Sequence, residues 1–136
     1  MIKQQKIILK EQSRGFHLIT DEILLSLNSL PDVGLVQLFL QHTSAGLTIN
    51  ENYDPDVHYD LTNIMDHLIP EGENFYTHIL EGRDDMPAHM KSSLVGTSLS
   101  VPIANGRLAL GTWQGIYLCE FRNHGGPRTI VVTIVS

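Results

Sequence analysis

Three histidines lie where a side chain can reach a ligand without disturbing a core. His42 follows an apolar run, His78 lies in a polar stretch, and His89 follows two acids closely. Imidazole is the commonest metal ligand in proteins and an acid–base group near neutral pH. If the three rings converge, they form an open zinc-type site with water in the fourth position. None of the three belongs to a short metal-binding motif, so their spacing alone leaves convergence open.

Polar groups beside these histidines could take part in the same chemistry. Thr43 and Ser44 follow His42 in a turn of small residues, where hydroxyls and backbone amides could hold an anion. Alternatively, the turn only closes a hairpin, and His42 is a hydrogen-bonded core residue. Asp85, the second of the two acids before His89, could orient an imidazole or simply cap a helix.

A second group of candidates lies further along the chain. Trp113, the only tryptophan, and Gln114 stand between glycines at the end of an apolar run. Trp113 could stack on a planar ligand that Gln114 fixes by hydrogen bonds, or it could be a core residue at a tight turn. Glu51 is a ligand, a general base or an exposed loop acid. Cys119 lies within an apolar run, so a buried, inert thiol is expected.

The elements that must position these groups are strands at both ends of the chain with helices between them, which is typical of the α+β class. Residues 35–40 are almost continuously apolar, which predicts a strand buried on both faces. Helices are predicted over residues 20–27, from Pro55 to Pro70, and over 87–95, and residues 71–85 predict a long loop. Further strands are expected at residues 6–10, 15–19, 47–51, 98–103, 107–113, 116–122 and 129–135.

Local signals give three sharper expectations. Asp54 should cap a helix whose first residue is Pro55. Thr20 should cap the short helix that follows it. Asn105 and Gly106 should form a type I′ hairpin turn, in which both residues take a positive φ.

Composition limits the class of protein. A chain of 136 residues, 42% of them hydrophobic, predicts one globular domain over residues 1–136. The formal net charge of -6 disfavours nucleic acid and anionic lipid as partners. No apolar run approaches the ~20 residues of a membrane span. With a single cysteine there is no internal disulfide, and a reducing, cytoplasmic location is expected.

Four motifs, taken together and in order, resemble the YjbQ-like family, also called the secondary thiamine-phosphate synthase family. They occupy residues 41–46, 50–57, 84–94 and 105–116, so that the resemblance covers nearly the whole chain. It implies a small β-sandwich of about seven strands with two to three helices, and a homotrimer that forms through its sheets. It also implies a histidine-bearing pocket, whose positions match His42, His78 and His89.

The activity implied by the family name joins a hydroxymethylpyrimidine diphosphate to a thiazole phosphate and releases pyrophosphate. On this reading His42, Glu51, Asp85 and His89 are catalytic, and the three histidines hold a divalent metal. The expected metal is zinc, or magnesium if pyrophosphate chemistry is the true activity, because magnesium prefers oxygen ligands. Substrate is expected to contact residues Thr43, Ser44, Lys91, Arg107, Trp113 and Gln114.

Two hypotheses from different classes follow. The first is a metal-assisted enzyme that acts on a small phosphorylated or heterocyclic substrate. The second is a trimer without catalytic activity that binds an anion or a metabolite. A metal-free variant of the first uses His42 and His89 as acid–base groups, with Asp85 orienting one of them and His78 in solvent.

Overall fold

The computed structural model describes residues 1–136 as eight strands and three helices. The class is α+β, as predicted, and the number of strands is close to the expected seven. In chain order the elements are β1 (Ile2–Leu9), β2 (Gly15–Leu18), α1 (Thr20–Ser26), β3 (Val33–Leu40), β4 (Ala45–Glu51), α2 (Pro55–Leu68), α3 (Asp85–Val95), β5 (Ser98–Ala104), β6 (Arg107–Leu108), β7 (Gln114–Glu120) and β8 (Arg128–Val135).

The strands form two sheets in which every pair is antiparallel. The larger sheet has the order β1-β8-β3-β5-β6, and the smaller has the order β2-β7-β4. Their facing sides enclose a core of 14 buried residues, including Leu38 of β3, Val132 of β8 and Leu118 of β7. Burial of this apolar surface is the main force that holds the two sheets together.

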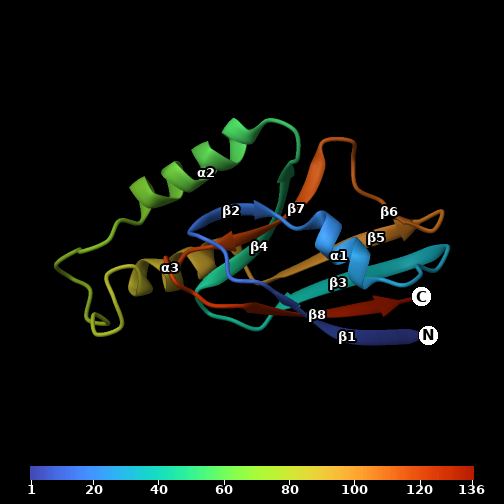
Figure 1. Cartoon of the computed structure of the whole chain (residues 1–136), viewed down its shortest axis with the longest axis horizontal. Helices are drawn as coiled ribbons and strands as arrows, with labels where there is room; N and C mark the ends of the chain where they lie inside the picture. The colour runs from blue at the N-terminus through green and yellow to red at the C-terminus, as the bar shows by residue number, and fades with distance from the viewer.

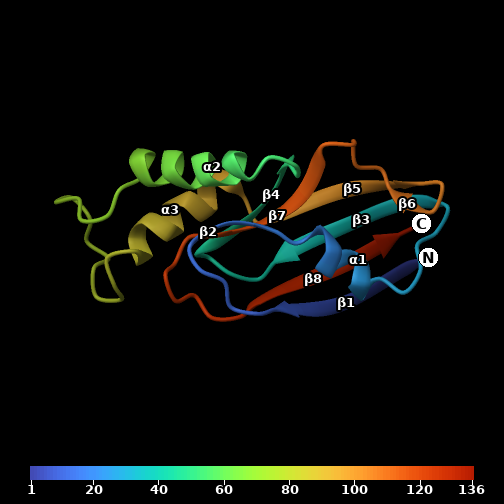
Figure 2. The ribbon, with the colours of Figure 1, turned by 45° about the horizontal axis from the view of Figure 1, so that its top comes forward.

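Helices α2 and α3 form a third layer on the other side of the smaller sheet (Figure 2). A second core of six buried residues joins them, with Tyr117 and Cys119 of β7 meeting Met65 of α2 and Ala88 of α3. β7 is therefore the strand that is buried on both faces. The prediction that residues 35–40 form such a strand is wrong, because β3 buries alternate residues only.

The outer face of the five-stranded sheet has no helix over it. Leu35 and Val135 lie opposite each other in the β3–β8 ladder, as do Phe39 and Val131. Leu35 is 39% exposed and Phe39 is 46% exposed, and Val33 beyond them is 69% exposed. An apolar sheet face of this kind is typical of an association surface.

Most of the local signals are confirmed. The Asp54 carboxylate accepts a hydrogen bond from the Asp56 amide at 2.9 Å, with Pro55 as the first residue of α2. Asn105 (φ 54°) and Gly106 (φ 73°) both take the positive φ of a type I′ turn. The prediction for Thr20 is wrong, since its hydroxyl accepts a hydrogen bond from the Ile116 amide instead. None of the three helices is long and apolar enough to span a bilayer.

Candidate metal centre

Two imidazoles and a carboxylate meet where the loop between α2 and α3 joins α3. Nε2 of His78 lies 2.7 Å from Oδ2 of Asp85, and Nε2 of His89 lies 3.1 Å from the same oxygen. The two rings are 5.3 Å apart between centroids. One ligand atom from each residue lies within 4.8 Å of the other two, which is close enough for one metal ion to bind all three.

Local structure explains this convergence. Asp85 and His89 are four residues apart on α3, so that both side chains project from the same face of the helix. His78 is brought to them by the loop, whose final turn contains Gly82 at φ +112°. A Cβ at Gly82 would lie 2.9 Å from a carboxylate oxygen of Asp84, so this turn requires glycine.

Arg122, two residues beyond the end of β7, holds the carboxylates in place. Its Nη1 lies 3.1 Å from Oδ1 of Asp85, and its Nε donates to Oδ2 of Asp84 at 3.3 Å. Nη2 of the same guanidinium donates to the Glu81 carbonyl at 2.8 Å. Arg122 thus joins the loop, the start of α3 and the end of β7.

The environment keeps Asp85 ionised. Burial alone would raise the pKa of Asp85, since its side chain is almost inaccessible. The hydrogen bond with His78 and the charges of His89 and Arg122 outweigh burial and hold the pKa below its ordinary value. The carboxylate is therefore available as an anionic ligand.

His89 has an oxygen acceptor beside each ring nitrogen. Nδ1 lies 2.8 Å from the carbonyl oxygen of Thr43, and Nε2 faces Asp85. A neutral imidazole has one N–H, and if Nδ1 donates it to Thr43, the lone pair of Nε2 is directed at a carboxylate. Either the ring carries two protons, or a cation lies between Nε2 and the carboxylate. A metal-binding histidine commonly donates its other N–H to a backbone carbonyl, so this arrangement fits a metal ligand.

His42 lies outside the cluster, and the expected set of three histidines becomes two histidines and Asp85. Nε2 of His42 accepts a hydrogen bond from the Thr129 amide at 2.8 Å, which requires an unprotonated nitrogen. Burial, followed by the charge of Arg128, lowers the pKa of His42, although Glu120 acts in the opposite direction. This neutral ring fastens the turn after β3 to the start of β8.

The same turn makes its other contacts through carbonyl groups. Thr43 contributes the carbonyl that orients His89, and Ser44 is buried with its carbonyl 3.3 Å from Nη2 of Arg128. The hydroxyls of Thr43 and Ser44 were predicted to help hold an anion, but the contacts of this turn do not involve them. What the sequence analysis missed is the backbone of this turn, for which residue type gives no signal.

A buried ion pair lies beneath the turn and was also missed. Nε of Arg128 donates to Oε1 of Glu120 at 2.7 Å, and both side chains are almost inaccessible. A Cβ at Gly125 would lie 2.5 Å from Nη2 of Arg128, so only glycine lets the chain pass over this pair. Glu120 ends β7 and Arg128 begins β8, eight residues later and in the other sheet, so the pair depends on the turn that connects the two sheets.

Lys91 is not placed to contact substrate. It is 1% exposed, and its Nζ donates to Oδ1 of Asp66 at 2.6 Å, which links α3 to α2. A buried ammonium needs such a partner. Arg107 is exposed on β6, beside the hairpin turn at the opposite end of the molecule from α3 (Figure 1).

Glu51, Trp113 and Gln114 also lie far from the cluster. β4 pairs with β7 from Ala45 opposite Glu120 to Glu51 opposite Gln114, and Thr43 and Arg122 adjoin the first of these ends. Six residues of strand separate the ends, about 20 Å at ~3.4 Å per residue. Within one chain, therefore, these three residues do not face the metal centre, contrary to expectation.

Residues that adjoin the cluster line two cavities. One of about 730 Å³ is bounded by the end of α2, the following loop and α3. Another, of about 600 Å³, contains His42 and Thr43 from the turn and Ser93 from α3.

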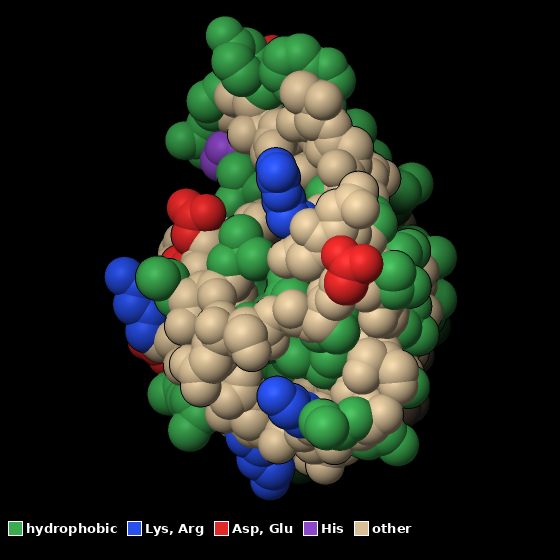
Figure 3. All heavy atoms as spheres, turned by 90° about the vertical axis from the view of Figure 1, so that its right-hand side faces the viewer, with side chains coloured by type: hydrophobic (Ala, Val, Ile, Leu, Met, Phe, Trp, Pro, Cys, Tyr) green, Lys and Arg blue, Asp and Glu red, His purple; other side chains and the backbone are tan.

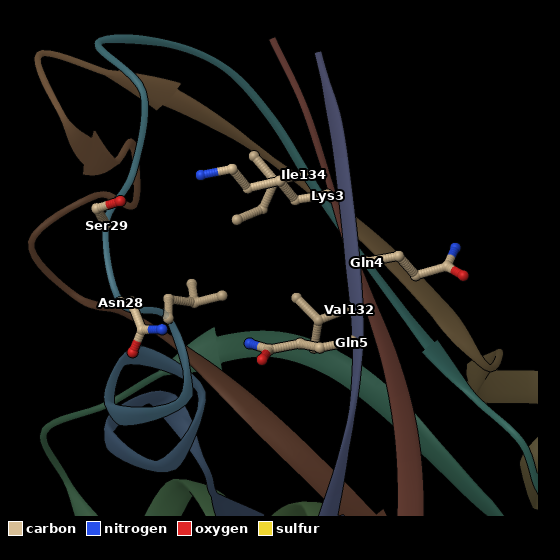
Figure 4. A pocket seen from close by; sticks show the side chains of 8 residues that line it. Lys3, Gln4, Gln5, Asn28, Ser29, Val132 and Ile134 are labelled. Atoms are coloured by element: carbon tan, nitrogen blue, oxygen red, sulfur yellow. The ribbon is translucent and has the colours of Figure 1, made fainter.

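A smaller cavity lies at the other end of the fold. It measures about 220 Å³, and Lys3 and Gln5 of β1 point across it toward Ser29 and Asn28 (Figure 4). No carboxylate, imidazole or thiol lines it. Viewed from that end, charged side chains stand apart among hydrophobic and neutral ones (Figure 3). The imidazole–carboxylate cluster and the buried ion pair lie away from this cavity.

Known proteins share both this sequence and this fold. The model of the family described as UPF0047 protein YjbQ-like matches residues 5–136. The UPF0047 protein YjbQ of Escherichia coli is 52% identical over 133 residues, 96% of each chain. A relative from Synechocystis is 42% identical over 96% of this chain and 90% of its own.

Solved structures agree. A conserved hypothetical protein from Thermus thermophilus superposes with a TM-score of 0.83 at 36% identity, covering 94% of this chain and 97% of that one. A YbjQ-like protein of unknown function from Sulfolobus solfataricus shares the fold, with a TM-score of 0.84 at 22% identity, over 98% of this chain and 96% of its own. On the sequence matches and the fold together, the chain belongs to the YjbQ-like UPF0047 family.

Proposed function

We propose that His78, Asp85 and His89 bind one divalent cation, and that the protein is a metal-dependent enzyme acting on a small molecule. The observation that carries the proposal is His89, whose two ring nitrogens both face oxygen atoms while a second imidazole shares the same carboxylate oxygen. A cation bound to both Nε2 atoms and to the carboxylate resolves this contact. Three protein ligands leave further positions for water or substrate, as in catalytic metal sites.

The ligand set favours zinc. Two imidazoles and one carboxylate suit zinc and related transition metals, whereas magnesium prefers oxygen ligands. When bound, such a metal polarises a substrate oxygen or lowers the pKa of a bound water. The residues around it have separate tasks: Thr43 fixes the His89 ring, and Arg122 fixes Asp85 and adds positive charge.

The first reaction to test is the formation of thiamine phosphate from the pyrimidine diphosphate and the thiazole phosphate. Arg122 supports this reaction, because its positive charge beside the metal ligands favours the charge that develops on a departing pyrophosphate. The alternative class is a protein that binds a metabolite without converting it. Product formation under zinc-loaded and metal-free conditions separates the two, since only an enzyme shows turnover that His89→Gln abolishes.

We also propose that the protein assembles as a homotrimer through the outer face of its five-stranded sheet. The exposed Val33, Leu35 and Phe39 support this, because burial of an apolar sheet face drives association. Sedimentation equilibrium should give three times the 15.2 kDa chain mass. Leu35→Lys should give a folded monomer, and a wild-type monomer at micromolar concentration would overturn the proposal.

The metal site is tested by binding rather than by turnover. Zinc titration followed by calorimetry, with metal content measured by mass spectrometry, should show one ion per chain. His89→Gln should abolish binding. His124→Gln is the matched control, because His124 is exposed in the turn after β7 and lies outside the cluster. Equal zinc affinity in both variants would overturn the assignment.

A further inference from the structure

The largest cavity beside the metal centre is apolar and open to solvent. Its volume is about 730 Å³, and its apolar lining includes Leu68, Phe75, Tyr76, Met86 and Met90. Leu68 is 65% exposed and Phe75 is 76% exposed, although both are large hydrophobic side chains. We call it the methionine cleft.

The chain itself places this cleft next to the metal ligands. Each of the three ligands, at positions 78, 85 and 89, has an immediate neighbour that lines the cleft. These neighbours are Thr77, Met86 and Met90. Met86 and Met90 project about 100° around α3 from Asp85 and His89, so the cleft flanks the ligand cluster.

The lining predicts the kind of group that fits. No lysine or arginine lines the cleft, and Glu73 and His67 are its acidic and imidazole groups. The Tyr76 hydroxyl is occupied by donation to the Pro70 carbonyl at 2.7 Å. A phosphate would find no cation here, whereas an uncharged ring or alkyl group would cover Phe75 and the methionines. Methionine is flexible and polarizable, so it adapts to ligands of irregular shape.

We infer that the ligand of this site is an amphipathic small molecule, with an oxygen-bearing group that reaches the metal and an uncharged apolar group that lies in the methionine cleft. The inference rests on the proposed metal site and adds the substrate class. It excludes a ligand that is anionic at both ends, since no lysine or arginine lines the cleft.

A pair of hydroxamates tests the inference with zinc-loaded protein. Acetohydroxamate and benzohydroxamate carry the same metal-binding group and differ in a phenyl ring. Benzohydroxamate should bind at least about tenfold more tightly, because its ring buries apolar surface that the methyl group does not. Both affinities are measured by calorimetry.

The four methionines of the chain provide an internal control. In spectra of ¹³C-labelled methionine methyl groups, benzohydroxamate should shift Met86 and Met90. Met65 is buried in the second core and Met1 lies on the chain end beside β1, so neither should shift. Met90→Gln should remove most of the tenfold preference. Leu94→Gln is the matched control, because Leu94 is also exposed on α3 but does not line the cleft.

The outcomes separate this inference from the proposed function. Equal affinity for the two hydroxamates, with Met86 and Met90 unmoved, overturns the inference and leaves the metal site intact. Failure of zinc and of both hydroxamates to bind overturns the metal site. In that case benzyl alcohol is titrated into metal-free protein, and the absence of shifts at Met86 and Met90 overturns the cleft as well. If the Met86 and Met90 methyl signals shift when the protein is diluted and not when ligand is added, a second copy of the chain occupies the cleft. That outcome also overturns the inference.

Discussion

The two ends of the β4–β7 pair both carry residues that predict chemistry, but only one end assembles them. At the end where Ala45 faces Glu120, neighbouring segments bring two imidazoles, several carboxylates and two arginines into mutual contact. At the end where Glu51 faces Gln114, Trp113 lies 5.3 Å from Tyr53 between ring centroids, and both rings are exposed.

The polar side chains at the second end are occupied by backbone groups of that same end. Oε1 of Gln114 accepts a hydrogen bond from the Gly111 amide at 2.8 Å. The Asn52 amide side chain donates to the carbonyl of Gln114 at 3.1 Å. The Tyr117 hydroxyl donates to the Glu51 carbonyl. The difference between the ends is that charged side chains interact with one another at the first, whereas at the second uncharged polar side chains bond to backbone groups.

The largest effect is expected from Arg128→Met at the assembled end. The substitution leaves the Glu120 carboxylate buried without its partner, and breaking a buried pair in this way costs about 3–5 kcal/mol of unfolding free energy. The free energy of unfolding is measured by urea denaturation. Arg107→Met, an exposed arginine at the far end of the larger sheet, should change it by less than about 0.5 kcal/mol.

A double variant sharpens this result. Glu120→Gln with Arg128→Met removes both charges, and it should recover part of the lost stability because no charge remains buried. Equal losses in the Arg128 and Arg107 single variants would contradict the distinction between the two ends.

The sequence predicts the fold, and the part of the site formed by Asp85 and His89, because both depend on local patterns. Local patterns determine the helix start at Asp54, the Asn105 turn and the spacing of Asp85 and His89, and each of these depends on residues close in the chain. The contacts of His42 and Lys91 depend on which strands and helices become neighbours. Residue type does not specify those partners, so the sequence assigns Lys91 to substrate and leaves His42 as either a ligand or a hydrogen-bonded residue, and the structure shows the second for His42.

Strand register is the second feature that the sequence does not reveal. The family resemblance predicts that Trp113 and Glu51 lie in the same site as the histidines. An antiparallel pair places its two ends at opposite sides of a sheet, and only the register reveals which end a residue occupies.

The second prediction concerns Arg122→Gln, which should lower zinc affinity about tenfold without removing any metal ligand. The pKa of Asp85 is held below its ordinary value despite burial, partly by the charge of Arg122. Without that charge the pKa rises, so protons compete with zinc at a higher pH. The midpoint of zinc binding against pH should therefore move upward. Arg83→Gln is the control, because Arg83 is 76% exposed and lies 3.8 Å from Glu71; an identical midpoint in both variants would refute the role of Arg122.

The third prediction concerns His42 and stability below neutral pH. Burial, followed by the charge of Arg128, lowers the pKa of His42 from its ordinary value of 6.5. As pH falls through 6.5, the unfolded chain takes up a proton that the folded protein does not, so the folded protein loses stability. His42→Gln keeps an acceptor for the Thr129 amide and removes this titration. Its melting temperature should fall less than that of the wild type between about pH 7 and pH 5. Parallel curves for the two proteins would show that His42 is protonated equally in both states.

The smallest effect is expected from Trp113→Ala, at the end that does not assemble a site. The exposed edge-to-face contact with Tyr53 should contribute at most about 0.5 kcal/mol to the free energy of unfolding. Zinc affinity should be unchanged, because about 20 Å of strand separates Trp113 from the cluster within one chain. The single tryptophan also serves as a reporter, and its fluorescence in dilute, monomeric Leu35→Lys protein should not respond to zinc. If zinc changes this fluorescence only in the assembled wild type, Trp113 of one chain lies beside the metal centre of another. In that case Trp113 is remote from the metal centre within one chain but lies beside it in the oligomer.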